Sequence, residues 1–176
     1  MAEVEIHTSH AHDPADTFGR NAGVMVGVIG IVLAVVTIAS HREHTAAVIY
    51  RTEANDQWSF YQAKKIRQHT QDVGITLLES LGTDPARTAP AAQRLRNERD
   101  RYGKESLDIQ REAEHKNTES QHAEALALRF DLGEGFLELG LVLTSLYFLS
   151  KKRLFVALGV TGALIGTAFA IGALLV

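Results

Sequence analysis

The sequence predicts an all-α membrane protein in which a long pair of polar helices connects the first of three transmembrane helices to the second. Three long runs are apolar and nearly free of charge, and each is close to the ~20 residues that a helix needs to cross the hydrocarbon core. The polar segment between the first two runs has its strongest helix breakers near its middle, from Gly82 to Pro85. We therefore expect an antiparallel helical hairpin, a coiled-coil-like stalk, that starts and finishes at the membrane.

The expected segments follow one another along the chain without overlap. They are a flexible polar tail (1–21), a first transmembrane helix (22–40), the hairpin stalk (41–129, with its turn near 82–91), a second transmembrane helix (130–150) and a third (154–176). The tail has few large apolar residues and cannot bury a core of its own. The first apolar run is too long for the apolar region of a cleaved signal peptide, so we interpret it as an anchor that stays.

Charge and composition exclude several classes of function. The segment 41–129 holds 14 Lys and Arg and 14 Asp and Glu, so it has no net field that would attract nucleic acid. The chain has no cysteine, which excludes disulfides, thiolate metal sites and a thiol nucleophile. No stretch spells a catalytic or nucleotide-binding motif, so we expect neither an enzyme nor a cofactor.

A heptad pattern on the stalk predicts how its two helices meet. On the second helix Leu95, Tyr102, Ile109, Lys116, Ala123 and Phe130 recur every seventh residue, and Ser106, Ala113, Ser120 and Ala127 form the intermediate set. On the first helix the expected stripe begins with Ala47, Tyr50, Ala54, Trp58 and Tyr61 and resumes with Ile66, Val73, Leu77 and Leu81. Such small side chains bury little area. We therefore expect stalks to pack together in a homo-oligomer, or against another subunit of a larger membrane complex.

Trp58, Phe60 and Tyr61 concentrate large rings on a helix that otherwise has few. They lie about eighteen residues beyond the first apolar run, roughly 27 Å along a helix, which is too far for an interfacial aromatic belt. We interpret them as an oligomer contact; a cage for a small molecule is the alternative.

Small residues on the apolar runs predict close helix packing. Gly27 and Gly30 lie on the first run, and Gly159, Gly162 and Gly166 lie on the third. Depth counting places the two sets at similar levels, so we expect the first and third helices to meet there in a parallel contact.

Asp131, Glu134 and Glu138 are spaced by three and four residues and so lie on one helical face. Glu138 lies about eight residues inside the second run, where an ionised side chain is costly, and no Lys or Arg occurs at that depth. Two interpretations stay open. The carboxyl is protonated and hydrogen-bonded to Thr167, or it faces water in a pore formed by several copies.

Histidines offer only weak candidates for a metal site. His41 and His44 lie one turn apart, and a hairpin would bring His122 and Glu119 back to a similar height. Two or three imidazoles and a carboxylate are ligands that zinc accepts, but histidines on polar helices are usually solvated, and we expect no metal.

The basic turn Lys151–Arg153 predicts topology. It is short, and positive residues in short loops favour the cytoplasmic side. The stalk would then lie on the extracytoplasmic side.

Three stretches resemble one known family. They are Asn-Asp-Gln-Trp-Ser-Phe-Tyr-Gln-Ala-Lys (55–64), Arg-Phe-Asp-Leu-Gly-Glu (129–134) and Lys-Lys-Arg-Leu-Phe (151–155). The chain from the first apolar run to its end is similar to the bacterial membrane proteins grouped as domain of unknown function 4337. The resemblance implies a bacterial multi-pass membrane protein and implies no activity. We expect it in the inner membrane of the cell.

We therefore expect a structural or assembly component that acts through its stalk and has the lipid bilayer as its surroundings. The alternative is a homo-oligomeric ion channel or transport accessory in which Glu134 and Glu138 line the path.

Overall fold

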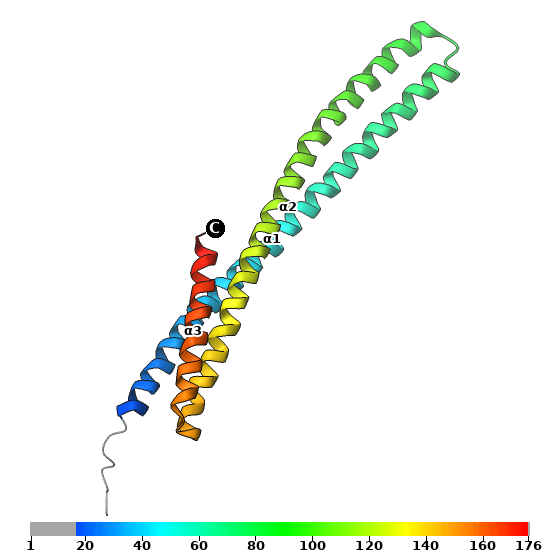
Figure 1. The fold of residues 1–176 in the computed structure, drawn as a ribbon. Coiled ribbons are helices and arrows are strands. Elements are labelled where there is room, and N and C mark those ends of the chain that lie inside the picture. Colours follow the sequence, from blue (N-terminus) through cyan, green and yellow to red (C-terminus); the bar gives the residue numbers. More distant parts are fainter. Residues whose placement is uncertain (1–16, 176) are drawn as a thin grey trace, which may run out of the picture. The chain divides into compact units, whose positions relative to one another are not determined.

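The structure is a computed structural model that describes residues 17–175, and these residues form three α-helices and no strand. The helices are α1 (Thr17–Leu81), α2 (Pro85–Ser150) and α3 (Arg153–Leu174) (Figure 1). All three are long and apolar enough to cross a membrane. The expected all-helical class with three such helices is confirmed. Residues 1–16 of the expected tail lie outside the described residues, whereas 17–21 already belong to α1.

The described residues divide into two compact units. The apolar unit contains residues 17–40 and 128–175, and the polar unit contains residues 41–127. Helices α1 and α2 each contribute to both units, because their sequences change from apolar to polar without any residue that stops a helix.

In the polar unit, α1 and α2 are joined by a connection shorter than the expected turn over 82–91. Only residues 82–84 are non-helical, and Pro90 lies inside α2. The Asp84 carboxylate accepts a hydrogen bond from the Ala86 N–H at 3.0 Å, which satisfies one of the unpaired N–H groups at a helix start. Pro85 can occupy the first helical position because no intrahelical bond needs its missing N–H.

Ion pairs show which residues of α1 and α2 meet in the polar unit. Residue numbers on α2 fall as those on α1 rise: the pairs are Arg51–Glu124 and Glu53–Lys116, both at 3.1 Å, Lys64–Glu105 at 2.5 Å, Asp72–Arg99 at 3.6 Å, and Glu79–Arg96. The Ser120 hydroxyl also donates to the Ala47 carbonyl at 2.9 Å.

The face of α2 that meets α1 follows the expected heptad. Ser106, Ala113, Ser120 and Ala127 are buried, and Leu95, Tyr102, Ile109 and Lys116 are half-buried. On α1, Ala47 and Ala54 are buried as expected. Most of the buried positions of this seam carry small side chains, so the seam encloses little apolar area.

The outer half of the expected α1 stripe is wrong. Four large apolar residues point away from α2, with exposures between 46% and 73%; they are Ile66, Val73, Leu77 and Leu81. The heptad that starts at Ala47 and Ala54 continues instead through Tyr61 and Gln68 to Ile75, which is buried. In this part of the seam, ion pairs lie beside Ile75, and the four exposed apolar residues take no part.

In the apolar unit, α2 and α3 approach each other at glycines. A Cβ atom built on Gly140 would lie 2.7 Å from the Gly159 carbonyl oxygen, and one built on Gly166 would lie 2.5 Å from the Gly133 carbonyl oxygen. Distances below about 3 Å exclude any side chain unless the helices move apart. Glycine therefore permits this contact because it has no Cβ.

The expected contact between the glycines of α1 and those of α3 is wrong. Nothing lies within 4 Å of a Cβ built on Gly27 or Gly30. Gly159 and Gly166 are already covered by α2, and Gly162 is in ordinary contact with it. The physical reason is that α2 carries small residues at a spacing that matches α3, a match that depth counting between α1 and α3 could not weigh.

Helix α1 joins the apolar unit through side chains. Ile29 and Val36 are buried in one cluster with Phe130, Leu137 and Ala163. A second cluster contains Ala22, Tyr147 and Val156, with Phe18 packed against it. These side chains are larger than the glycines between α2 and α3. The α1 backbone therefore lies farther from its neighbours than the α2 and α3 backbones lie from each other.

The glycine contact predicts opposite effects for two identical substitutions. Gly166→Ala should destabilise the protein by about 1–3 kcal/mol, because the methyl group would meet the α2 backbone. Gly27→Ala should be neutral or should stabilise it by up to about 1 kcal/mol, because the site is open and alanine favours helix. Thermal unfolding of both variants in mild detergent measures the difference. Equal effects of the two substitutions would contradict the assignment of the contact.

Candidate functional site

Two of the three carboxylates near the start of the apolar part of α2 bind hydroxyl groups of α1. The Ser40 hydroxyl donates to Asp131 at 2.5 Å, and the Thr37 hydroxyl donates to Glu134 at 2.7 Å. Ser40 is 1% exposed, whereas Asp131 and Glu134 are half-buried. Hydrogen bonds to charged acceptors are stronger than neutral ones, so these carboxylates help to hold α1 against α2 within the apolar unit.

Glu138 has different surroundings from Asp131 and Glu134. Its side chain is exposed at the surface of the apolar unit. The expected hydrogen bond with Thr167 is not formed, because the Thr167 hydroxyl donates to the Ala163 carbonyl at 2.8 Å within α3. The structure therefore assigns two roles to one helical face: Asp131 and Glu134 bind α1, whereas Glu138 points away from the described part of the chain.

The aromatic residues of α1 do not form one cluster. Trp58 and Tyr61 are half-buried and pack edge to face, with ring centroids 5.5 Å apart. Phe60 lies between them in sequence but is 59% exposed. Trp58 and Tyr61 thus help to fill the polar unit, and Phe60 is the ring left at its surface.

Two charge clusters reinforce the seam of the polar unit. Lys64 donates a hydrogen bond to Glu105, and its ammonium nitrogen lies 5.4 Å from the centre of the Tyr102 ring. The hydrogen bond from Lys64 holds the pKa of Glu105 below its ordinary value. Farther along, hydrogen bonds to Glu119 and Glu53 raise the pKa of Lys116. Both shifts favour the charged forms of Glu105 and Lys116.

The exposed residues Ile66, Val73, Leu77 and Leu81 define the outer stripe, a feature that sequence reasoning placed inside the seam. They recur at intervals of seven, four and four residues, the spacing of one helical face. The seam and the outer stripe therefore occupy different faces of α1. The available signal was the charge pattern: Glu53, Lys64, Asp72 and Glu79, which bind α2 through ion pairs, share the seam face.

The histidine candidates are not brought together as a metal site. His41, His44 and His122 are all exposed. Glu119 binds Lys116 at 3.1 Å and lies 3.6 Å from His115. Among residues 17–175, no group of three or more histidine or carboxylate side chains is placed to hold a metal ion.

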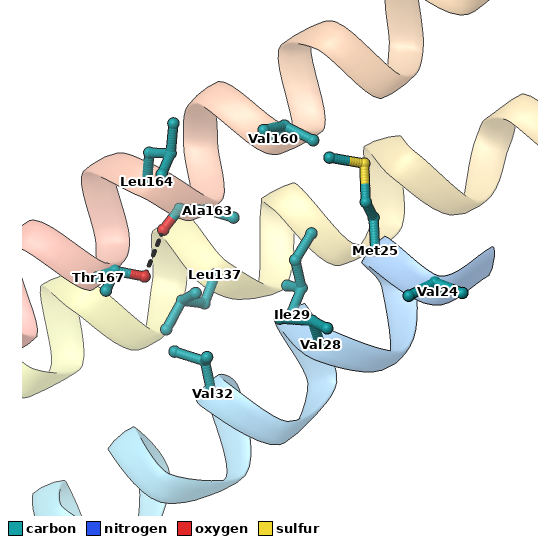
Figure 2. Close-up of a pocket in the computed structure, with 10 residues that line it drawn as sticks. All are labelled: Val24, Met25, Val28, Ile29, Val32, Leu137, Val160, Ala163, Leu164 and Thr167. Atoms are coloured by element: carbon teal, nitrogen blue, oxygen red, sulfur yellow. Dashed lines mark hydrogen bonds between the residues drawn. The ribbon is translucent and has the colours of Figure 1, made fainter. Parts of the chain in front are cut away.

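The sequence did not predict an apolar groove that opens between the three helices of the apolar unit. Figure 2 shows residues of α1, α2 and α3 around it. Its volume is about 230 Å³. The groove exists because α1 packs through large side chains while α2 and α3 meet at glycines. Periodicity in one helix carries no signal for such a space.

The described residues define an all-helical protein whose three helices have the length and composition of membrane spans. The chain belongs to the family described as Domain of unknown function (DUF4337), whose model matches residues 18–176. The resemblance noted in the sequence is thereby confirmed. No curated protein and no solved structure matches the chain.

The hydroxyl–carboxylate bonds predict a specific loss of stability. Thr37→Val removes the donor to Glu134 and should destabilise the protein by about 1.5–3 kcal/mol, the usual range for a hydrogen bond to a charged group. Thr161→Val is the matched control, because Thr161 is exposed and its hydroxyl binds the Ala157 carbonyl of its own helix. Thermal unfolding in mild detergent should show a clear effect for Thr37→Val only. An equal response of both variants would contradict the role of the Thr37–Glu134 bond.

Proposed function

We propose that this protein is a non-catalytic, multi-pass component of the bacterial inner membrane that assembles through its polar unit. The single observation that carries the proposal is the outer stripe, which exposes four large apolar residues on a unit whose own seam is thin. Copies of the same chain, or another subunit of a membrane complex, are the partners proposed for it.

The surface of the apolar unit supports a membrane location. Large apolar side chains are exposed on all three helices; examples are Ile31, Val35, Leu139, Leu149, Leu164 and Leu174. In water such a surface would be an aggregation liability. In the bilayer the same side chains are solvated by lipid, and the helices satisfy their own backbone groups.

The pairing of ion partners supports an antiparallel hairpin in the polar unit. Glu53 meets Lys116, whereas Glu79 meets Arg96, close to the connection at 82–84. The positive turn Lys151–Arg153 favours the cytoplasmic side, which supports an extracytoplasmic polar unit.

The energetics of the hairpin support assembly. Its buried positions are mainly Ala and Ser, and exposed ion pairs contribute only about 0–1 kcal/mol each. A two-helix unit of this kind gains little from burial. Covering Val73 and Leu77 with a neighbouring helix would add about 1.5–3 kcal/mol for each fully buried side chain.

Disrupting the outer stripe tests the assembly. Val73→Ser with Leu77→Ser should lower the copy number in mild detergent, as measured by light scattering or mass photometry, because both side chains would lose their apolar contacts. Ile49→Ser with Leu107→Ser is the matched control, since these residues are similarly exposed but lie off the stripe. A wild-type chain that is monomeric, or a double variant with unchanged copy number, would contradict assembly through this stripe.

The exposure of Glu138 favours one second candidate, an ion channel or transport accessory. A carboxylate at the surface of an apolar helix is costly unless another copy or water solvates it. In a ring of copies, Glu138 could line a cation path, with Glu134 beside it.

Ion flux tests this second candidate directly. Purified protein in liposomes should pass monovalent cations, and Glu138→Gln should reduce the flux at least tenfold if this carboxylate lines the path. Glu124→Gln, which changes an exposed carboxylate of the polar unit, should leave it unchanged. Liposomes that stay impermeable with an assembled wild-type protein would exclude the channel and leave the scaffold.

A further inference from the structure

We propose that the apolar groove and the cations at one end of it form a binding site for an anionic phospholipid, with the phosphate at the cations and one acyl chain in the groove. The proposal rests on the membrane location proposed above and identifies a ligand for the apolar unit.

The lining of the groove selects a hydrocarbon chain. Its walls are formed by aliphatic side chains such as Val24, Val28, Val160 and Leu164, and Thr167 is the polar residue among them (Figure 2). The Thr167 hydroxyl donates to the Ala163 carbonyl. A polar ligand would therefore lose its hydration without gaining hydrogen bonds, whereas an acyl chain has no polar hydration to lose.

Arginines lie on the groove faces of two helices. On α1, Arg20, Val24 and Val28 are four residues apart, and residues at this spacing share one face. On α3, Arg153 precedes Val160 by seven residues, which again returns to the same face. Arg20 and Arg153 thus both lie beyond the Val24 end of the groove. Arg20 is one helical turn from Val24, and Arg153 is two turns from Val160.

Aromatic contacts bring these two helix starts together. The rings of Phe18 and Tyr147 lie 5.0 Å apart. The Arg153 guanidinium lies 4.7 Å from the centre of the Phe18 ring, and the Lys151 ammonium lies 5.8 Å from the centre of the Tyr147 ring. Phe18 is on α1 and Tyr147 is on α2. Contacts with these two rings therefore hold Lys151 and Arg153 beside the start of α1.

The charged residues that the described helices and the turn carry at this end of the unit are all basic. From Thr17 to Arg42, and from Leu139 to Leu175, the sequence contains no Asp or Glu. Arginine binds phosphate through two parallel hydrogen bonds, and each basic residue near a membrane surface adds about 1 kcal/mol of attraction to anionic lipid.

The dimensions agree with a phospholipid. Arg20 lies one helical turn, about 6 Å, from Val24, and the groove then extends along α1 from Val24 to Val32, about 12 Å. A headgroup phosphate at the cations would therefore be followed by the first part of an acyl chain in the groove. In a phospholipid the phosphate also lies at one end of the acyl chain, as the cations lie at one end of the groove.

Lipid binding can be measured on the full chain in mild detergent by native mass spectrometry, with phosphatidylglycerol and phosphatidylcholine of identical chains as probes. We expect the wild type to prefer phosphatidylglycerol. Arg20→Gln with Arg153→Gln should weaken that binding about tenfold or more, because each cation accounts for roughly a fivefold change. Arg94→Gln with Lys104→Gln removes the same charge from exposed positions of the polar unit and should leave the preference intact.

The groove is tested by filling it. Val160→Trp should reduce the binding of long-chain phosphatidylglycerol, whereas Leu158→Trp, at a neighbouring exposed position, should not. Equal binding of both lipids by the wild type, or a preference that survives Arg20→Gln with Arg153→Gln, would overturn the site. Val160→Trp that lowers copy number and leaves lipid binding unchanged would also overturn it and would assign the groove to a second copy.

Fractionation separates this proposal from the membrane location on which it rests. Wild type and variants that all remain with the membrane fraction, but show no lipid preference, would refute the lipid site alone. A wild-type chain found in the soluble fraction would refute the proposed membrane location and the lipid site together.

Discussion

The close backbone contact between α2 and α3 is the constraint on which the apolar unit depends. Gly133 and Gly140 on α2 meet Gly166 and Gly159 on α3 at distances that admit no side chain. In the proposed membrane location, helices gain no hydrophobic energy from pairing, so such backbone proximity and its dispersion contacts would hold them together. Because the glycines of α2 and α3 are in contact with each other, α1 packs against both helices through larger side chains. The open face at Gly27 and the apolar groove are both consequences of that division.

The polar unit is held together in a different way. Its seam consists of small side chains and a series of ion pairs, with Tyr50 and Tyr102 beside lysines. Such ion pairs specify which residues of the two helices meet. They add little stability, because water screens exposed charges. The larger apolar residues of α1 lie on another face. A unit built in this way has a well-defined register and a surface suited to neighbours, and this combination is what a scaffold needs.

Polar groups near the apolar unit have three distinct uses. Ser40 and Thr37 bind carboxylates of α2 and so hold α1 in place. Glu138, one or two turns farther along α2, has no such neighbour and is exposed. At the other end of the apolar unit, Arg153 and Lys151 lie beside the rings of Phe18 and Tyr147. Asp131 and Glu134 therefore lie toward one end of the apolar unit, where Arg129 precedes them, and Lys151 and Arg153 lie toward the other.

The sequence by itself determined the helices, the family and the polar seam of α2. Long uncharged runs and a period of seven are local properties of one chain segment, and they are sufficient for these features. Only the tertiary structure decided that Gly159 and Gly166 meet α2 rather than α1, that Ile66 and Val73 face away from the seam, and that Glu138 has no bond with Thr167. Each of these depends on which of several similar helical faces meet. Faces lined with small residues are nearly equivalent in sequence, and they are distinguished only when the backbones are close enough to test the fit.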